Sequence, residues 1–345
     1  ATPEHIKQAA VKALEEDKTF YTANAGLLEL REEIANYLAR RFHIDYNPQK
    51  EIIVTIGASQ AIDVAIRTLV EPGDEVLIPQ PSFVAYAPCT HLAGGKPVYV
   101  PTYEKDDFVL KAEILEKYIS QKSKILILPY PNNPTGAIMT YEQLKEIANL
   151  VEKHDLLVVT DEIYCELTYG TEHTSFASIP GMWERTVIVN GLSKSYAMTG
   201  WRLGYLAAPE GLSAEILKVH SYNVTAAATM GQYAAIEALR NGDEDIKTMK
   251  AEYDRRRRFL LNSLRDMGFE CFEPKGAFYV FPSIKKTGLS SEQFAERLLK
   301  EGKVSVVPGS AFGENGQGYV RMAYATSMEN LREAVERIRR FVENL

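Results

Sequence analysis

Hydrophobic positions near the start of the chain follow helical spacing. In residues 27–42, apolar side chains recur every three or four positions, which predicts an amphipathic helix. The same spacing in residues 6–14 predicts an earlier helix, with Thr2 as its N-cap and Pro3 in its first turn. Because this helix starts almost at once, we expect that a segment normally precedes it. Residues 59–70 show a third helical pattern.

Short runs of branched apolar residues predict buried strands between such helices. A capping box at Thr140 and Gln143 opens one of the helices. This alternation predicts an α/β fold, with a mostly parallel sheet sandwiched by helices. Six runs read as strands of this sheet: Glu51–Ile56, Glu75–Pro79, Lys124–Leu128, Leu156–Thr160, Thr186–Asn190 and Leu203–Ala207.

The pattern changes after residue 240, where a smaller α+β domain is expected. Residues 243–267 predict one long helix, whose run Arg255–Arg258 we interpret as a solvated face. We expect a large domain over 20–250 and a small one over 1–19 and 251–345, so that the N-terminal helix packs with the C-terminal third. The remaining predicted elements are strands at 278–281, 304–307 and 318–323, a helix from Ser290 and a final helix after Ser327.

Composition excludes several classes of protein. Lys and Arg number 39 against 46 Asp and Glu, a net charge of −7, which argues against nucleic acid as a main partner. Three distant cysteines suggest a reducing cytoplasm rather than a disulfide scaffold. No run approaches the ~20 apolar residues that span a bilayer, so no membrane partner is expected. The six histidines form no zinc motif, and we expect no metal site.

Four polar segments follow predicted strands, where ligands bind in open α/β sheets. No glycine-rich dinucleotide motif, P-loop or complete nucleophile elbow is present among them. The segments are Gly57–Gln60, Tyr130–Gly136, Asp161–Tyr164 and Ser193–Arg202.

Together with Arg321, these segments resemble fold-type I pyridoxal-phosphate aminotransferases of the aspartate aminotransferase superfamily, class I/II. The resemblance covers nearly the whole chain. It is closest to the bacterial aminotransferase A type, which is associated with N-acetyl-L,L-diaminopimelate in lysine biosynthesis. It implies the cofactor pyridoxal 5'-phosphate, transfer of an amino group from an L-amino acid to a 2-oxo acid, 2-oxoglutarate as acceptor, and a cytoplasmic homodimer.

The resemblance also implies catalytic roles for three residues. Lys194 matches the Schiff-base lysine, whose amine attacks the cofactor's carbonyl and then carries the substrate's proton. Asp161 matches the carboxylate that pairs with the pyridine nitrogen, although an Asp at a strand end is also a common helix cap. Tyr164 matches the tyrosine that hydrogen-bonds the phenolic oxygen of the cofactor.

Further positions match binding contacts of the family. Arg321 corresponds to the arginine that holds the substrate's α-carboxylate, although a surface ion pair is the plainer reading of such a residue. Asn133 corresponds to a residue that contacts both cofactor and substrate. Tyr21 corresponds to a tyrosine that reaches the phosphate in the neighbouring subunit. The phosphate and ring contacts implied within the chain are Ala58, Ser59, Phe83, Ser193 and Arg202.

Two departures concern the substrate. Residues 221–228 contain no arginine where the aspartate-specific branch grips a second carboxylate, and Ser59 stands where another branch has a lysine. A longer or neutral-ended donor therefore fits better than aspartate. The same site also allows a β-lyase, decarboxylase or racemase, whereas a DNA-binding regulator lacks its basic domain in these residues.

Overall fold

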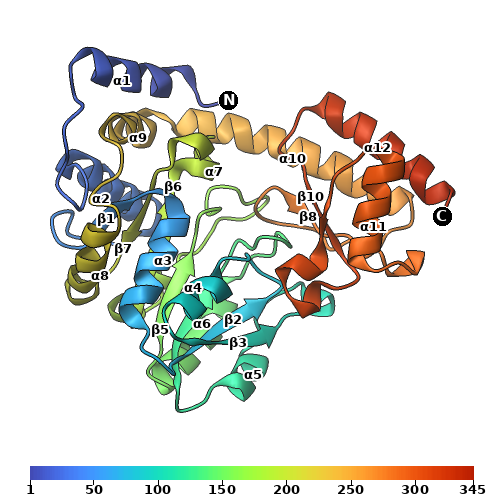
Figure 1. The fold of residues 1–345 in the computed structure, drawn as a ribbon, viewed down its shortest axis with the longest axis horizontal. Helices are drawn as coiled ribbons and strands as arrows, with labels where there is room; N and C mark the ends of the chain where they lie inside the picture. Colours follow the sequence, from blue (N-terminus) through green and yellow to red (C-terminus); the bar gives the residue numbers. More distant parts are fainter.

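The computed structural model describes residues 1–345, and a seven-stranded mixed sheet forms its centre (Figure 1). The strand order is β1-β7-β6-β5-β4-β2-β3, and β7 alone runs opposite to the other six strands. The predicted mostly parallel sheet is thus confirmed. The strands are β1 (Ile52–Thr55), β2 (Glu75–Gln80), β3 (Lys96–Pro101), β4 (Ser123–Leu128), β5 (Leu157–Asp161), β6 (Thr186–Gly191) and β7 (Gly204–Ala207).

Helices cover both faces of this sheet because successive strand residues point to opposite sides. Ile53 packs in one apolar cluster with α3 and α8, whereas its neighbours Ile52 and Val54 pack in another with α2 and α9. The helices of this part are α2 (Leu28–Phe42), α3 (Gly57–Leu69), α4 (Tyr86–Leu92), α5 (Ala112–Leu115), α6 (Tyr141–Lys153), α7 (Leu192–Ser195), α8 (Glu210–Asn223) and α9 (Thr229–Asn241).

A smaller antiparallel sheet lies beside the large one, in the order β8-β10-β9. It shares a separate core of fifteen buried residues with the helices around it. The long helix α10 runs from the large sheet towards this part (Figure 1), while the domain boundary at residue 250 stays a prediction. The elements are α10 (Asp243–Asp266), β8 (Tyr279–Val280), α11 (Ser291–Arg297), β9 (Val307–Pro308), β10 (Val320–Ala323) and α12 (Met328–Glu343).

The first helix, α1 (Glu4–Glu15), does not pack where we expected it. Ile6 and Ala10 join the core formed by α2, α9 and the large sheet, and His5 lies 2.9 Å from Asp245 at the start of α10. The helix therefore contacts the start of the C-terminal third but does not join the core of the small sheet. Thr2 is not the N-cap either. Its hydroxyl donates to the carbonyl of Ala197 at 2.7 Å, because this end of α1 lies against the loop after α7. Pro3 takes the capping position without a side-chain bond.

The arginine run on α10 is solvated only in part. Arg255 and Arg258 are exposed and pair with Glu252 and Asp254, as a solvated face requires. Arg257 is buried and donates to the Pro274 carbonyl at 3.0 Å, so it ties the helix to the loop before β8.

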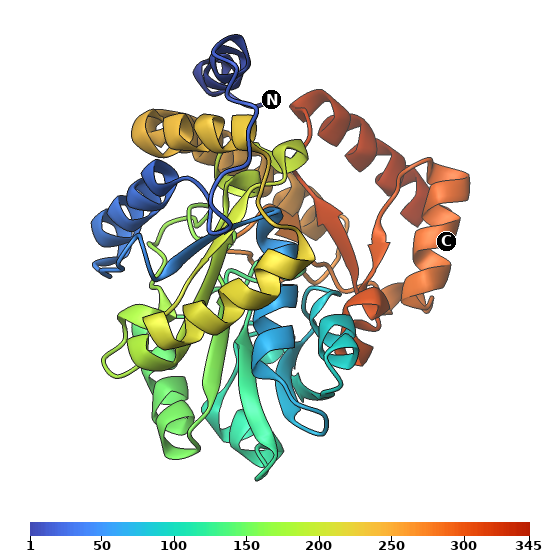
Figure 2. The same cartoon turned by 60° about the vertical axis from the view of Figure 1, so that its left-hand side comes forward.

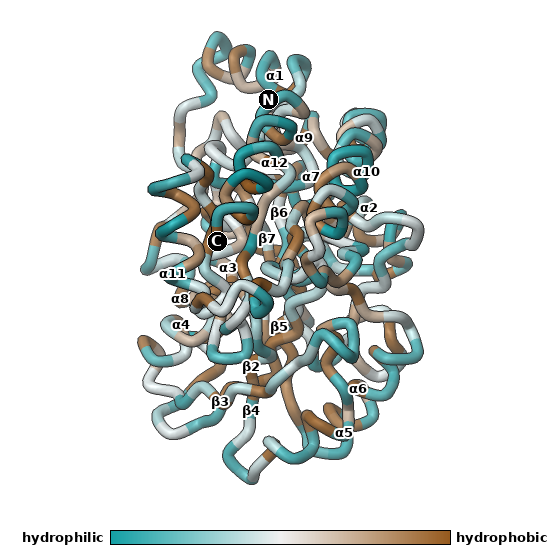
Figure 3. The backbone as a smooth tube through the Cα atoms, turned by 90° about the vertical axis from the view of Figure 1, so that its right-hand side faces the viewer, coloured by the Kyte–Doolittle hydropathy of each residue, from teal (hydrophilic) through white to brown (hydrophobic).

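Hydrophobic residues concentrate on the central strands and hydrophilic ones on the outward sides of the helices (Figure 3). No helix combines the length and the apolar character that a membrane span requires. The six strands predicted for the large sheet are confirmed to within two residues, and the capping box at Thr140 and Gln143 is present.

Candidate active site

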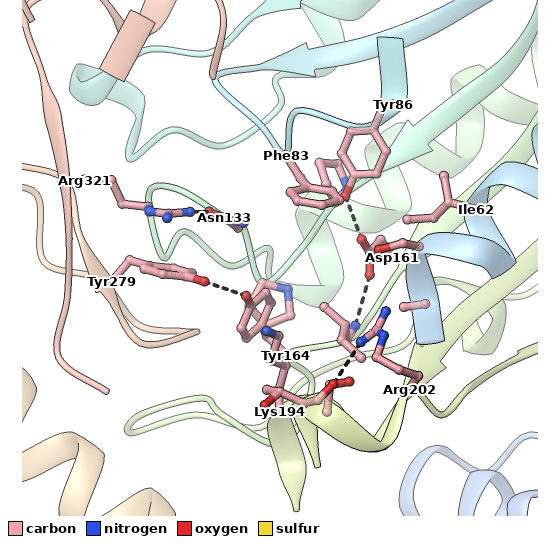
Figure 4. A pocket seen from close by; sticks show the side chains of 17 residues that line it. Ile62, Phe83, Tyr86, Asn133, Asp161, Tyr164, Lys194, Arg202, Tyr279 and Arg321 are labelled. Carbon is pink, nitrogen blue, oxygen red and sulfur yellow. Dashed lines mark hydrogen bonds between the residues drawn. The ribbon is translucent and has the colours of Figure 1, made fainter. Parts of the chain in front are cut away.

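The four polar segments and Arg321 meet at one cavity of about 320 Å³ between the two sheets (Figure 4). Asp161 ends β5, Lys194 follows β6, and α3 begins directly after β1, so strand ends position most of the lining. Arg321 comes from β10 of the small sheet. The lining includes every predicted site residue except one: Ala58, Ser59, Phe83, Asn133, Asp161, Tyr164, Ser193, Lys194, Arg202 and Arg321.

Asp161 is a buried carboxylate with no side-chain cation as partner. Only 7% of the residue is exposed. Its Oδ2 accepts a hydrogen bond of 2.7 Å from the Tyr86 hydroxyl, and its Oδ1 accepts one of 3.2 Å from the Ile163 N–H. Burial raises the pKa of Asp161 because the charged form loses its hydration. A cationic group entering the cavity beside it would stabilise its charge.

Lys194 extends from α7 into the same cavity. Its Nζ lies 5.8 Å from the ring centre of Tyr164 and 5.5 Å from that of Phe278, and it forms no ion pair. Burial, and then repulsion from the Arg202 cation, lower the pKa of Lys194. The neutral, nucleophilic amine is therefore available at a lower pH than for a solvated lysine.

An anion-binding turn lies at the start of α3. The first N–H groups of a helix have no partner within it and carry the positive end of its dipole. Arg202 lies over this turn, so close that a Cβ on Gly57 would be 2.6 Å from its Nη2. Gly57 has φ +74°, and a Cβ on Gly204 of β7 would lie 2.5 Å from the Ala58 nitrogen. These two glycines allow the guanidinium and the helix start to share one small space.

Serine hydroxyls and an aromatic ring complete this end of the cavity. Ser59 of α3 and Ser193 of α7 both line it, and Ser193 is buried. Phe83 packs edge-to-face on Tyr86, with ring centres 5.7 Å apart. Phe83 therefore lines the cavity as well as packing against its neighbours, as the resemblance implied.

Arg321 and Asn133 form the opposite end. The Arg321 Nη1 donates to the Asn133 Oδ1 at 2.8 Å. The guanidinium also lies 4.4 Å from the ring centre of Tyr279 and 4.9 Å from that of Phe312. No carboxylate pairs with it, so the alternative of a surface ion pair is not what the structure contains. The remaining donors of this fork can hold a ligand's carboxylate.

Tyr164 lies between these two ends of the cavity. Its hydroxyl shares a hydrogen bond of 2.9 Å with the Tyr279 hydroxyl. Burial raises the pKa of both phenols, and it places the pKa of Tyr164 well above its ordinary value. Both are therefore neutral hydrogen-bonding groups.

Tyr86 and Tyr279 line the cavity but were not among the residues predicted from the sequence. Tyr86 stands three residues after Phe83, which is the only signal that could have suggested it. Tyr279 belongs to a two-residue strand, and nothing in its sequence neighbourhood points to Tyr164. Tyr21 is 89% exposed and lies outside the cavity lining.

Comparison with known proteins gives the class of this chain. The family described as aminotransferase class I and II matches residues 1–338. The putative aminotransferase YugH of Bacillus subtilis is 52% identical over 338 residues, which cover 98% of this chain and 88% of that protein. The probable N-acetyl-LL-diaminopimelate aminotransferase of the same species is 46% identical over 341 residues, covering 99% and 86%.

A solved structure agrees with both. The aromatic aminotransferase from Pyrococcus horikoshii OT3 has a TM-score of 0.98 at 49% identity, covering 99% of this chain and 93% of that one. The chain therefore belongs to the class I and II aminotransferases. It is a pyridoxal 5'-phosphate-dependent aminotransferase.

The cavity suits that cofactor on physical grounds. Asp161 is a buried acid that lacks a cation, which a protonated pyridine nitrogen would provide. The turn at Gly57 and Arg202 offers N–H groups and a guanidinium to a phosphate. Lys194 is an unpaired amine with a lowered pKa, as covalent capture of an aldehyde requires.

Proposed function

We propose that this aminotransferase moves the amino group of an L-amino acid to 2-oxoglutarate, with Lys194 as its catalytic base and acid. The observation that carries the proposal is the convergence of Asp161, Lys194, Arg202 and Arg321 on one cavity. The bound cofactor supplies an electron sink for the carbanion formed at the substrate's α-carbon.

The remaining steps belong to side chains of this chain. Asp161 holds the ring nitrogen protonated, and Tyr86 holds the Asp161 carboxylate in place. With the cofactor bound, the Lys194 amine would take the proton from the substrate's α-carbon as catalytic base and give it back as catalytic acid. Tyr164 and Asn133 donate hydrogen bonds to the phenolic oxygen of the cofactor. Burial of Tyr164 supports the role of a neutral donor.

The phosphate and the substrate's carboxylate take opposite ends of the cavity. The phosphate would be held by Ala58, Ser59, Ser193 and Arg202, and Phe83 would contact the cofactor's ring. Arg321 binds the α-carboxylate of donor and acceptor, and its bond to Asn133 fixes the plane of the fork.

The donor has a neutral side chain or a long one. Arg202 and Arg321 are the only arginines in the lining, and Lys194 is the only lysine, so no further cation of this chain is left for a second carboxylate nearby. Aromatic amino acids are neutral, and N-acetyl-L,L-diaminopimelate is long enough to extend beyond this lining. The latter would place the enzyme in lysine biosynthesis. Similarity to relatives named for each of these activities supports both donors.

A homodimer in the cytoplasm completes the proposal, with Tyr21 of each subunit contacting the phosphate held by the other. Exposure of Tyr21 on the isolated chain supports this role, because 89% of the residue is accessible to a second subunit. The absence of disulfides among the three cysteines fits a reducing compartment.

A donor panel tests the proposal. The purified enzyme is assayed with 2-oxoglutarate and aromatic amino acids, aspartate or N-acetyl-L,L-diaminopimelate, and kcat/KM is compared. We expect stoichiometric glutamate, the highest values for an aromatic or the acetylated donor, and no turnover by Lys194→Ala. Full activity of Lys194→Ala, or pyruvate and ammonia in place of glutamate, would contradict the assignment.

A further inference from the structure

His220 is a fully buried histidine outside the cavity, and the reaction described above does not use it. It lies near the end of α8 and is 0% exposed. Figure 2 shows α8, in yellow, beside the blue α3 that starts at the phosphate-binding turn. Its two ring nitrogens reach two different segments of the chain.

The hydrogen bonds of His220 fix a single arrangement. Its Nε2 lies 3.0 Å from the Asn24 carbonyl, which only accepts, so Nε2 carries the proton and donates. Its Nδ1 then accepts from the Gln60 amide nitrogen at 3.0 Å. The Gln60 Oε1 is left to accept from the Ile56 N–H at 2.9 Å. All three bonds agree with a neutral imidazole. Burial also lowers the pKa of His220, which favours the neutral form.

On one side, these hydrogen bonds hold the anion-binding turn at the start of α3. The bond between Ile56 and Gln60 spans Ala58 and Ser59, which line the cavity. An amide side chain can rotate, and only one rotamer presents its oxygen to Ile56. By holding the amide nitrogen of Gln60, His220 keeps that oxygen in place.

The other end holds the segment that carries Tyr21. Asn24 stands three residues after Tyr21. The neighbouring Ala25 carbonyl accepts from the Val54 N–H at 2.9 Å, and the Leu27 N–H donates to Gln232 at 2.7 Å. The segment is therefore fixed behind Tyr21 by its contact with His220, by β1 and by α9.

We propose that His220 is a positioning residue that aligns both phosphate contacts: its own subunit's turn at Ala58 and Ser59, and the Tyr21 segment offered to the neighbouring subunit. The second half rests on the proposed dimer. The imidazole touches neither cofactor nor substrate, and it acts through Gln60 on one side and Asn24 on the other.

The test compares two aldehydes that differ only in the phosphate. Apoenzyme is titrated with pyridoxal 5'-phosphate and with pyridoxal, and binding is followed by absorbance. In His220→Leu we expect the Kd for pyridoxal 5'-phosphate to rise about tenfold, as for the loss of one buried hydrogen bond. The Kd for pyridoxal should stay within about twofold, because it has no phosphate to misplace.

Two further variants control for stability. Gln60→Leu should show the same kind of selective loss. The loss in the double variant should be smaller than the product of the two single losses, because both changes act on the bond between Ile56 and Gln60. Ser213→Ala removes a buried hydroxyl from the same helix, where it donates to the Lys50 carbonyl at 2.7 Å. It should leave the ratio of the two Kd values unchanged. Equal weakening of both aldehydes by His220→Leu and Gln60→Leu, or no weakening, would overturn the proposal.

Tyr21→Phe separates the two halves. If His220 acts through the Tyr21 segment, the losses of Tyr21→Phe and His220→Leu combine to less than their product. If the loss of affinity in the double variant equals the product of the two single losses, His220 does not act through the Tyr21 segment. Unchanged affinity in Tyr21→Phe would instead overturn the proposed completion of the site by the neighbouring subunit, and with it the Tyr21 half, while the Gln60 half is still decided by the two aldehydes.

Discussion

Replacing Arg321 with lysine tests the carboxylate site most directly. The change keeps the positive charge but removes the planar fork, which here donates to Asn133 at 2.8 Å and lies 4.4 Å from the Tyr279 ring centre. Lysine retains attraction to the rings and to a carboxylate. What it loses is the paired, oriented hydrogen bonding of the guanidinium.

The expected loss follows from that difference. One charge-assisted hydrogen bond to the carboxylate contributes about 2–3 kcal/mol. We therefore expect Arg321→Lys to lower kcat/KM for the best L-amino acid by about 30- to 150-fold. For the amine made by removing that donor's carboxyl group, the loss should be less than about threefold, since the broken contact does not exist there.

Single-turnover absorbance measures both reactions, because it does not require the amine to turn over rapidly. Arg297→Lys provides a matched control, since Arg297 lies 5.7 Å from the Phe341 ring centre in a similar contact far from the cavity. It should change neither rate. Equal losses for the amino acid and the amine in Arg321→Lys would refute the carboxylate role of Arg321.

Three other predictions concern buried ionisable groups. Tyr86→Phe removes one of two hydrogen bonds to Asp161, so the pKa of Asp161 should rise further. The acidic limb of the pH profile of kcat/KM should then move to higher pH. If the limb does not move, Asp161 does not control it. Because burial and Arg202 lower the pKa of Lys194, the rate at which apoenzyme captures pyridoxal 5'-phosphate should fall with decreasing pH around a midpoint below that of a free lysine derivative, and coincident midpoints would contradict this. Arg41→Ala leaves the buried Glu166 carboxylate without its cation. We expect the free energy of unfolding in urea to fall by about 2 kcal/mol, a moderate loss because the Arg41 side chain is 40% exposed. Adding Glu166→Gln removes the unpaired charge and should restore most of that free energy.

Helices and strands with a clear pattern of apolar residues could be predicted from the sequence, whereas a strand with few buried residues could not. Five of the six residues of β2 and four of the six of β4 are buried, and the apolar runs of both strands revealed them. The strand β3 was missed because it lies at the edge of the sheet, where only Val100 is fully buried and no apolar run forms.

Packing partners were harder to predict than elements. The spacing of Ile6 and Ala10 predicts a helix and an apolar face, but it does not say which core receives that face. The same holds for Thr2, whose hydroxyl bonds Ala197, a partner almost two hundred positions away. Local patterns carry no information about such contacts.

For the candidate site, the resemblance placed ten side chains that the fold brings to one cavity. It did not give Tyr86 or Tyr279, because their roles arise from bonds to Asp161 and Tyr164 across the fold. The role of Tyr21 stays a prediction, since it depends on a second subunit.

The contact between Gly204 and the start of α3 has a consequence for redesign of this enzyme. No side chain fits there, since even a methyl group would meet the backbone of Gly57 and Ala58 at 2.5 Å. Libraries aimed at new amino donors should therefore leave this wall unaltered. They should instead vary positions at the Arg321 end of the cavity, such as Phe312, whose ring centre lies 4.9 Å from the guanidinium, because that end lies away from this wall.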